Sequence, residues 1–159
     1  MLKLNCKKSD SKSVTEILVT MIANEYELDP ALVAAVILTE SSGVPDVARL
    51  EQGFYRRYVK QLDLPITEEI CRAASFGLMQ IMGQTAREFG FMDHFDKLEQ
   101  PEVNIDLGCK ILSKYINDKK DLRRGLLRYN GGGDLTYPDK VLSKVDDGSY
   151  KKLWAVIWE

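Results

Sequence analysis

The sequence is poor in the residues that most metal sites and nucleophilic triads require. Its 159 residues include one histidine, His94, and three cysteines without a Cys-x-x-Cys spacing. An odd number of cysteines without that spacing argues against a disulfide framework and against a zinc site. We therefore expect Cys6, Cys71 and Cys109 to be free thiols, two of them packed in the core. His94 lies in the polar stretch MDHFDK, and we expect it on the surface.

Long apolar runs and an excess of positive charge are also missing. No apolar run approaches the roughly 20 residues that span a bilayer, so no membrane span is expected. Lysine and arginine number 22 against 24 acidic residues, for a net charge of −2. This balance lacks the basic excess of a nucleic-acid-binding domain.

The first residues, MLKLNCKKSDSKS, lack the long apolar core of a cleavable secretory signal. Three explanations remain open. The chain acts where it is made, it leaves by a route without a cleaved signal, or a leader precedes this sequence. We expect residues 1–12 to form a flexible segment and residues 13–159 to form one domain, with a monomer as the default state.

Helical signals follow one another along the chain. Ser13 and Glu16 form a capping box before an amphipathic helix, and Asp29-Pro30 is a typical N-cap followed by a first-turn proline. Residues 44–74 read as loop and short helix, with room for a small β-hairpin, and no clear period-two strand appears. The sequence therefore predicts an all-α domain. The helices expected are 14–27, 30–40, 67–71, 77–82, 84–89, 101–117, 121–129 and one that begins at Pro138. Trp154 and Trp158, four residues apart, are expected to clamp a separate last helical turn.

Glu40 is the most informative carboxylate. It follows the apolar run AAVIL, so the helix that it ends is expected to cross the centre of the domain. Apolar surroundings disfavour the charged form and raise the pKa of a carboxyl, which suits it to act as a general acid near neutral pH. A solvated glutamate at a helix end is an equally good interpretation of position alone.

Two other stretches combine polar groups with glycine. SFGLMQIM places Gln80 among apolar neighbours and Gly77 where a backbone can approach a ligand closely. YNGGG places Tyr129 and Asn130 at the end of a helix, where glycines are also common as ordinary C-caps. Each stretch alone fits an ordinary structural role.

The order of these motifs is more specific than any one of them. TESSG, SFGLMQIMGQTA, PEVNI, LLRYNGGG and YPDKV occur in sequence, and together they resemble the soluble lytic transglycosylases, whose relatives include the goose-type lysozymes. The resemblance covers roughly residues 14–145. It implies a mainly helical lysozyme-like fold with a long cleft.

The resemblance also implies roles for individual residues. Glu40 matches the catalytic acid, and Tyr137 matches a late tyrosine that points toward it. The positions that match residues around the sugar subsites are Ser41, Gly77, Leu78, Met79, Gln80, Tyr129 and Asn130. The sequence departs from the family pattern in a long segment between Glu40 and Gly77, at Gly83, at Gly132 and at Pro138. The long segment is expected to reshape one wall of the cleft.

The implied reaction is cleavage of peptidoglycan between N-acetylmuramic acid and N-acetylglucosamine, leaving 1,6-anhydro ends, without metal or cofactor. The alternative within the same fold is a hydrolytic lysozyme, which needs a second carboxylate to hold water, with Glu51 preferred over Asp46. A wall-binding module without catalysis and a protein-interaction helical bundle are the alternatives from other classes. The resemblance implies action on the bacterial cell wall, and the long segment is similar to those of phage-associated members.

Overall fold

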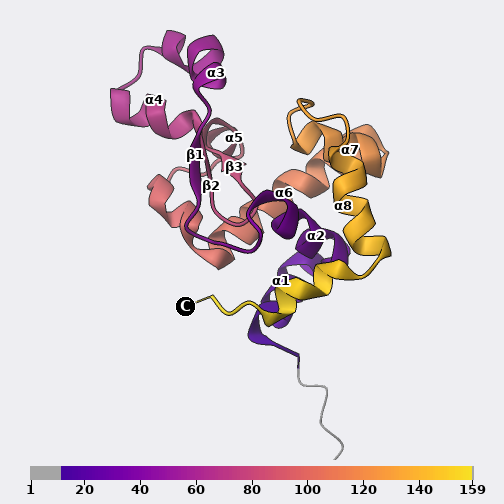
Figure 1. The fold of residues 1–159 in the computed structure, drawn as a ribbon. Helices are drawn as coiled ribbons and strands as arrows, with labels where there is room; N and C mark the ends of the chain where they lie inside the picture. Colours follow the sequence, from indigo (N-terminus) through magenta and orange to yellow (C-terminus); the bar gives the residue numbers. More distant parts are fainter. Residues whose placement is uncertain (1–11, 159) are drawn as a thin grey trace, which may run out of the picture.

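The computed structural model describes residues 12–158, and its helices surround one small sheet (Figure 1). The expected flexible segment 1–12, apart from Lys12, and Cys6 lie outside the described residues. The α-helices are α1 (Val14–Glu25), α2 (Pro30–Glu40), α3 (Gln52–Phe54), α4 (Ile66–Arg72), α5 (Gly83–Glu88), α6 (Pro101–Lys119), α7 (Leu122–Tyr129) and α8 (Tyr137–Asp146). The strands are β1 (Ala48–Leu50), β2 (Ala74–Phe76) and β3 (Ile81–Met82). A π-helix η1 (Tyr55–Val59) and the 3₁₀-helices η2 (Lys60–Leu62), η3 (Phe95–Glu99) and η4 (Ser149–Ala155) complete the set. The prediction of a mainly helical, lysozyme-like fold is confirmed.

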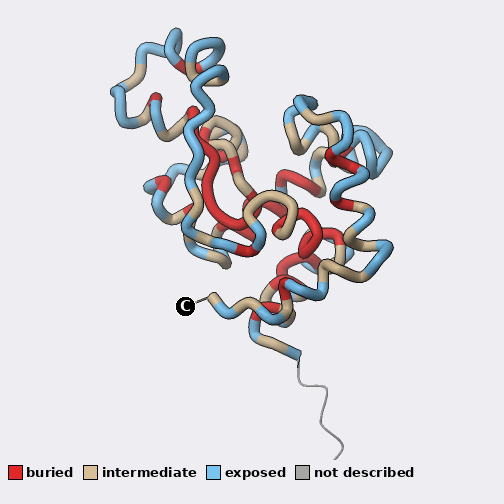
Figure 2. The backbone as a smooth tube through the Cα atoms, in the orientation of Figure 1, coloured by how far each residue is buried: buried red, intermediate tan, exposed pale blue. Residues whose placement is uncertain are grey.

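Helix α2 runs through the core, as its apolar sequence predicts. All residues from 32 to 37 are buried, and α2 packs against α1, α8 and η4 (Figure 2). The Asp29 carboxylate accepts a hydrogen bond from the Ala31 amide at 2.8 Å, and Pro30 occupies the first turn. A helix anchored by burial on every side holds its last residue, Glu40, in a fixed place.

The other strong helix signals are also confirmed. Ser13 caps α1 by accepting from the Glu16 amide, and Asp121 caps α7 by accepting from the Arg124 amide. The helix expected over residues 101–117 is α6, and its apolar stripe faces the core, with Leu107, Ile111 and Leu112 buried and Tyr115 and Ile116 packed against the core. Cys109 is buried and Cys71 is half-buried, both as free thiols, and His94 is exposed.

The prediction of a helix over residues 77–82 is wrong. Residues 77–80 form a turn, and residues 81–82 form β3, which pairs antiparallel with β2. Gly77 and Gln80 have positive φ angles of 73° and 46°, which no right-handed helix contains. Helix α5 begins at Gly83, where the sequence suggested a break. The strands are too short, and β2 too completely buried, to show a period-two pattern.

The segment 44–74 contributes β1, a short helical run and α4. Its strand β1 pairs antiparallel with β2, so the sheet order is β1-β2-β3. The expected hairpin is therefore formed by β2 and β3 rather than inside 44–74. Figure 1 shows α3 and α4 at the end of the sheet that is remote from α2.

The C-terminal tryptophans do not share a helical turn. Trp154 packs edge-to-face on Tyr150 within η4, whereas Trp158 lies beyond its end. The Trp158 indole Nε1 donates to the Gly43 carbonyl at 2.9 Å and so holds the loop that follows Glu40. No helix among residues 12–158 has the length and apolar character to cross a membrane.

Candidate active site

The Glu40 carboxyl lies in largely apolar surroundings at the end of α2. The Tyr137 hydroxyl donates a hydrogen bond to Glu40 Oε1 at 2.6 Å. Burial raises the pKa of Glu40 above its usual value, while the Tyr137 hydrogen bond and the Arg49 charge oppose that shift without cancelling it. The carboxyl therefore holds its proton to higher pH than an exposed glutamate does. A group of this kind can act as a general acid.

Tyr137 is positioned by the start of α8. It is 3% exposed, and the neighbouring Pro138, where the family pattern differs, occupies the first turn of the helix. Burial, followed by the nearby Glu40 charge, raises the pKa of Tyr137. The phenol therefore stays protonated and acts as a donor to Glu40.

The turn at residues 77–80 is attached to the end of α2 and to α7. The Ser41 hydroxyl donates to the Leu78 carbonyl at 2.8 Å, and the Tyr129 hydroxyl donates to the Met79 carbonyl at 2.8 Å. Burial is the main cause of a raised pKa of Tyr129, and the Glu40 charge adds to it. Two hydroxyls from separate helices thus fix this turn beside Glu40.

Asn104 on α6 supports the same turn from beneath. Its side-chain Oδ1 accepts from the Met79 amide at 2.7 Å, and its Nδ2 donates to the carbonyls of Phe76 at 2.9 Å and Leu98 at 2.6 Å. Asn104 is fully buried. The motif PEVNI contains this asparagine, but the sequence analysis assigned it no role, because its partners are remote in the chain.

Both the nitrogen and the oxygen of the Gln80 side-chain amide form hydrogen bonds within the protein. Its Nε2 donates to the carbonyls of Val47 at 3.0 Å and Gly77 at 2.9 Å. Its Oε1 accepts from Arg49 Nε at 2.7 Å and from the Ser75 hydroxyl at 2.9 Å. The side chain therefore joins β1, β2 and the turn.

Arg49 is a further residue that the sequence analysis missed. From β1 its Nη2 donates to the Glu40 backbone carbonyl at 2.7 Å, while its Nε donates to Gln80. No local pattern could have identified it, because an arginine on an exposed three-residue strand has no distinctive signature. In the structure it is the cation that acts on the Glu40 carboxyl.

Replacement of Arg49 by glutamine is expected to shift the pH profile of activity. Because the Arg49 charge lowers the pKa of Glu40, its removal raises that pKa further. The limb on which activity falls with rising pH should therefore move to higher pH. Arg49→Lys, which keeps the charge, should restore most of the original profile. An unchanged limb in Arg49→Gln would show that Arg49 does not act on the titrating group.

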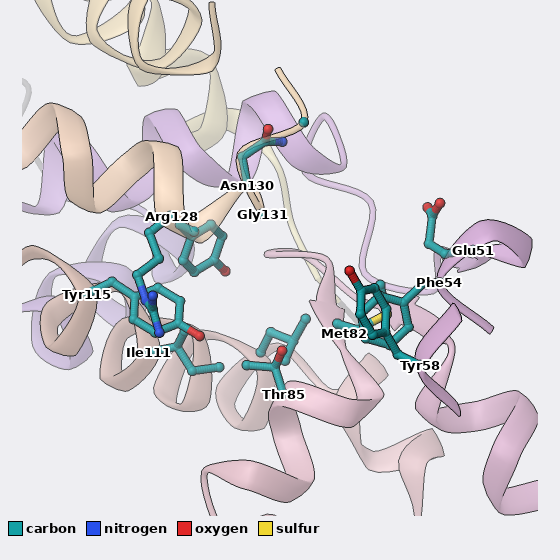
Figure 3. A pocket seen from close by; sticks show the side chains of 13 residues that line it. Glu51, Phe54, Tyr58, Met82, Thr85, Ile111, Tyr115, Arg128, Asn130 and Gly131 are labelled. Carbon is teal, nitrogen blue, oxygen red and sulfur yellow. The ribbon is translucent and has the colours of Figure 1, made fainter. Parts of the chain in front are cut away.

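A cleft of about 1040 Å³ meets this arrangement at Tyr129, whereas Glu40 and Tyr137 are not among its lining residues (Figure 3). One wall carries Glu51, Phe54 and Tyr58 from the long segment, and the opposite wall carries residues of α6, α7 and the loop that follows. Its lining residues are Glu51, Phe54, Tyr58, Ile81, Met82, Thr85, Ile111, Tyr115, Arg128, Tyr129, Asn130, Gly131 and Gly133. Phe54 and Tyr58 pack on each other with ring centroids 5.0 Å apart. Aromatic walls with a few polar groups are typical of a ligand site.

The predicted site residues thus form two groups in the structure. The first group is connected by hydrogen bonds to Glu40 or to the turn next to it, and it consists of Ser41, Gly77, Leu78, Met79, Gln80 and Tyr137. The Leu78 and Met79 side chains are wholly buried. Tyr129 and Asn130 line the cleft, and the Asn130 Oδ1 accepts from the Asp134 amide at 3.0 Å. Glu51 lies across the cleft on the other wall and is exposed. Residues 12–158 contain no cluster of His, Cys, Asp and Glu side chains that could hold a metal ion.

Known proteins are similar to this chain over the region that contains the site. The family model described as the transglycosylase SLT domain matches residues 17–144, which include the acid, the turn and both tyrosines. A protein of Enterobacteria phage PRD1 named transglycosylase is 31% identical over 130 residues, covering 77% of this chain and 39% of the relative. The chain therefore spans about two fifths of the length of that relative. No solved structure matches the chain significantly.

Proposed function

The chain belongs to the transglycosylase SLT domain family, and from this premise we propose that it is a lytic transglycosylase that cleaves peptidoglycan. The resemblance noted in its sequence motifs to this family and to phage-associated members is confirmed. The observation that carries the proposed activity is the half-buried Glu40 carboxyl, which has a raised pKa and accepts the Tyr137 hydrogen bond at 2.6 Å. The cleft is large enough for several sugar rings, and Tyr129, which lines it, bonds to the same turn as Ser41, the residue that follows Glu40.

In the first step, protonated Glu40 donates its proton to the oxygen that bridges N-acetylmuramic acid and N-acetylglucosamine. The bond from this oxygen to C1 of the muramyl ring breaks, and positive charge develops at C1. The carbonyl oxygen of the substrate's own N-acetyl group then bonds to C1, so the enzyme needs no carboxylate nucleophile. Tyr137 keeps the Glu40 carboxyl oriented through both changes of its charge.

In the second step, ionised Glu40 takes the proton of the muramyl 6-hydroxyl. The 6-oxygen attacks C1, the bond between C1 and the N-acetyl oxygen breaks, and a 1,6-anhydro ring closes. The proton that Glu40 gave up in the first step is thereby restored. One carboxyl acts first as an acid and then as a base, and the reaction consumes no water.

The surroundings of Glu40 favour this mechanism over hydrolysis. Enzymes that use two carboxylates hold them roughly 5 to 9.5 Å apart, a distance at which each charge affects the other. Within the described residues the Glu40 carboxyl accepts a hydrogen bond from Tyr137, and no acidic side chain is hydrogen-bonded to it. Glu51, the candidate for a second carboxylate, lies on the opposite wall, and Asp46 lines no part of the cleft.

Sugar binding is assigned to the walls of the cleft. We place Tyr129 and Asn130 in contact with the glycan next to the cleaved bond, because they line the cleft beside the acid. Phe54 and Tyr58 offer flat apolar surfaces to the sugar rings on the opposite wall. Ser41 and Gln80 support the site indirectly, because their side chains hold the turn at residues 77–80 through hydrogen bonds within the protein.

Mass spectrometry of the digestion products tests the proposed reaction. We expect muropeptides with 1,6-anhydro ends, which are lighter by one water than the reducing ends that hydrolysis leaves. Glu51→Gln should keep the same anhydro ends and should reduce the rate far less than a change at Glu40. Reducing ends from the wild type, together with loss of activity in Glu51→Gln, would establish the lysozyme alternative instead.

The wall of a bacterium is the proposed place of action. The phage PRD1 relative carries the name transglycosylase, and the similarity supports a virus-associated role for this chain as well. The two functions without catalysis, a wall-binding module and an interaction bundle, are less well supported. Neither explains a half-buried carboxyl whose pKa is raised by burial and which accepts a hydrogen bond from a buried tyrosine.

A further inference from the structure

A second groove, of about 530 Å³, adjoins the cleft on the outer side of α6 and α7. It lies between the last turns of α6, α7 and the glycines that follow α7. Its lining residues are Tyr115, Lys119, Arg124, Leu127, Arg128, Gly131 and Gly132. No role has been assigned to this groove by the mechanism above.

The groove is continuous with the cleft. Tyr115, Arg128 and Gly131 line both spaces. The Arg128 guanidinium lies over the Tyr115 ring, with its central carbon 4.6 Å from the ring centroid, and so marks the boundary (Figure 3). A branch on a glycan strand that lies in the cleft can therefore enter the groove directly, at the place where these three residues line both spaces.

The groove has a strong local positive charge. Lys119, Arg124 and Arg128 are exposed, and none of them forms an ion pair with a carboxylate within residues 12–158. Of the cations near them in the chain, Arg123 pairs with Asp139 and Lys114 pairs with Asp118 at 3.1 Å, whereas Lys120 forms no ion pair within the described residues.

These three cations, which form no ion pair within residues 12–158, make a local excess of positive charge in a chain whose net charge is −2. The acidic side chains close to these cations are Asp118, which pairs with Lys114, and Asp121, which accepts from the backbone amide of Arg124 at 2.8 Å. The charge of Glu88 also acts on Tyr115. The three positive charges are therefore available to an anion from outside the chain.

We propose that this groove binds the carboxylates of the peptide stem that branches from a muramyl residue of the bound strand. The inference rests on the proposed function, since it needs a glycan strand in the cleft. Peptide stems carry free carboxylates a short distance from the sugar, and arginine forks bind carboxylates with two parallel hydrogen bonds. The groove then selects strands by the charge of their stems, as a specificity site separate from the acid.

A nucleic acid is a poorer occupant of the groove. Phosphate backbones are bound by extended basic surfaces that neutralise many charges, whereas this groove offers three cations on an acidic chain. A short branch with one or two carboxylates matches the number of charges better.

The test compares two forms of one substrate. Uncrosslinked peptidoglycan strands with free-acid stems are prepared, and half of them are amidated chemically, so that each stem carboxylate becomes a neutral carboxamide. The wild type and the variant Lys119→Gln with Arg124→Gln are then compared by kcat/KM on both substrates. These two residues line the groove and not the cleft.

The wild type is expected to favour the free-acid strands by about fivefold to tenfold, the range for one or two partly exposed charged hydrogen bonds. The double variant should lose that preference while keeping the wild-type rate on amidated strands. The control variant Lys151→Gln with Lys152→Gln removes two exposed charges from η4 and should keep the preference.

Two results would overturn the inference. One is equal cleavage of both substrates by the wild type, and the other is an equal loss on both substrates in the double variant. Failure of the wild type to cleave either substrate would instead contradict the proposed function. The two failures are therefore distinguishable in one experiment.

Discussion

Replacement of Glu40 by glutamine is expected to lower the rate of wall cleavage by at least about 10³-fold, since one group supplies both acid and base catalysis. The amide keeps the size of the side chain, and its oxygen can still accept the Tyr137 hydrogen bond. It has no proton to give to the bridging oxygen and cannot take one from the 6-hydroxyl. The measurement is the release of soluble muropeptides from purified walls.

The same substitution should leave the protein at least as stable as the wild type at neutral pH. Burial raises the pKa of Glu40 in the folded state, so the folded protein binds the proton more tightly than the unfolded chain. The stability that this proton provides is complete below the unfolded pKa and is lost as pH rises through the folded pKa. A neutral glutamine avoids that loss. Thermal unfolding near pH 7 separates lost chemistry from lost folding.

Glu51→Gln is the matched control for this experiment. It makes the same chemical change on the opposite wall of the cleft, in an exposed side chain. Substantial activity in Glu40→Gln, within about tenfold of the wild type, would contradict the assignment of the acid, because general acid and base catalysis contributes about 10² to 10⁴.

Local signals were sufficient to predict the part of the site that lies on α2. The Asp29-Pro30 start and the continuous apolar run specify a buried helix, and a buried helix fixes where Glu40 lies. Both signals act between neighbours in the chain, so a single sequence contains them. The environment that raises the pKa of Glu40 could be anticipated for the same reason.

The support of the site could not be predicted in this way. Residues 77–82 have apolar spacing that suits a helix, yet they form a turn and a strand because Asn104 bonds to Met79 and Ser41 bonds to Leu78. These partners come from helices that are distant in the sequence. Likewise, nothing near Gln80 indicates that Arg49 of the long segment will occupy its amide oxygen. Tertiary hydrogen bonds override local propensity here.

Gly77→Ala is expected to be the most damaging substitution for stability, with a loss of about 3 to 5 kcal/mol in the free energy of unfolding. Gly77 has a φ of 73°, which disfavours any side chain, and it also lies against buried groups. A Cβ there would come 2.2 Å from Asn104 Nδ2 and 2.3 Å from the Leu98 carbonyl oxygen. Because these two atoms bond to each other, the methyl group would have to break the contact that supports the turn.

Gly148→Ala separates the two causes of that loss. Gly148 has the same φ of 73°, but a Cβ there would meet nothing within 4 Å. This variant should therefore lose only the cost of the left-handed conformation, about 1 to 2 kcal/mol. Urea unfolding midpoints of both variants give the comparison. Equal losses would mean that the Asn104 contact does not hold the turn. A much larger loss for Gly77→Ala would show that the buried Asn104 amide, rather than the walls that face the sugar, stabilises the structure around Glu40.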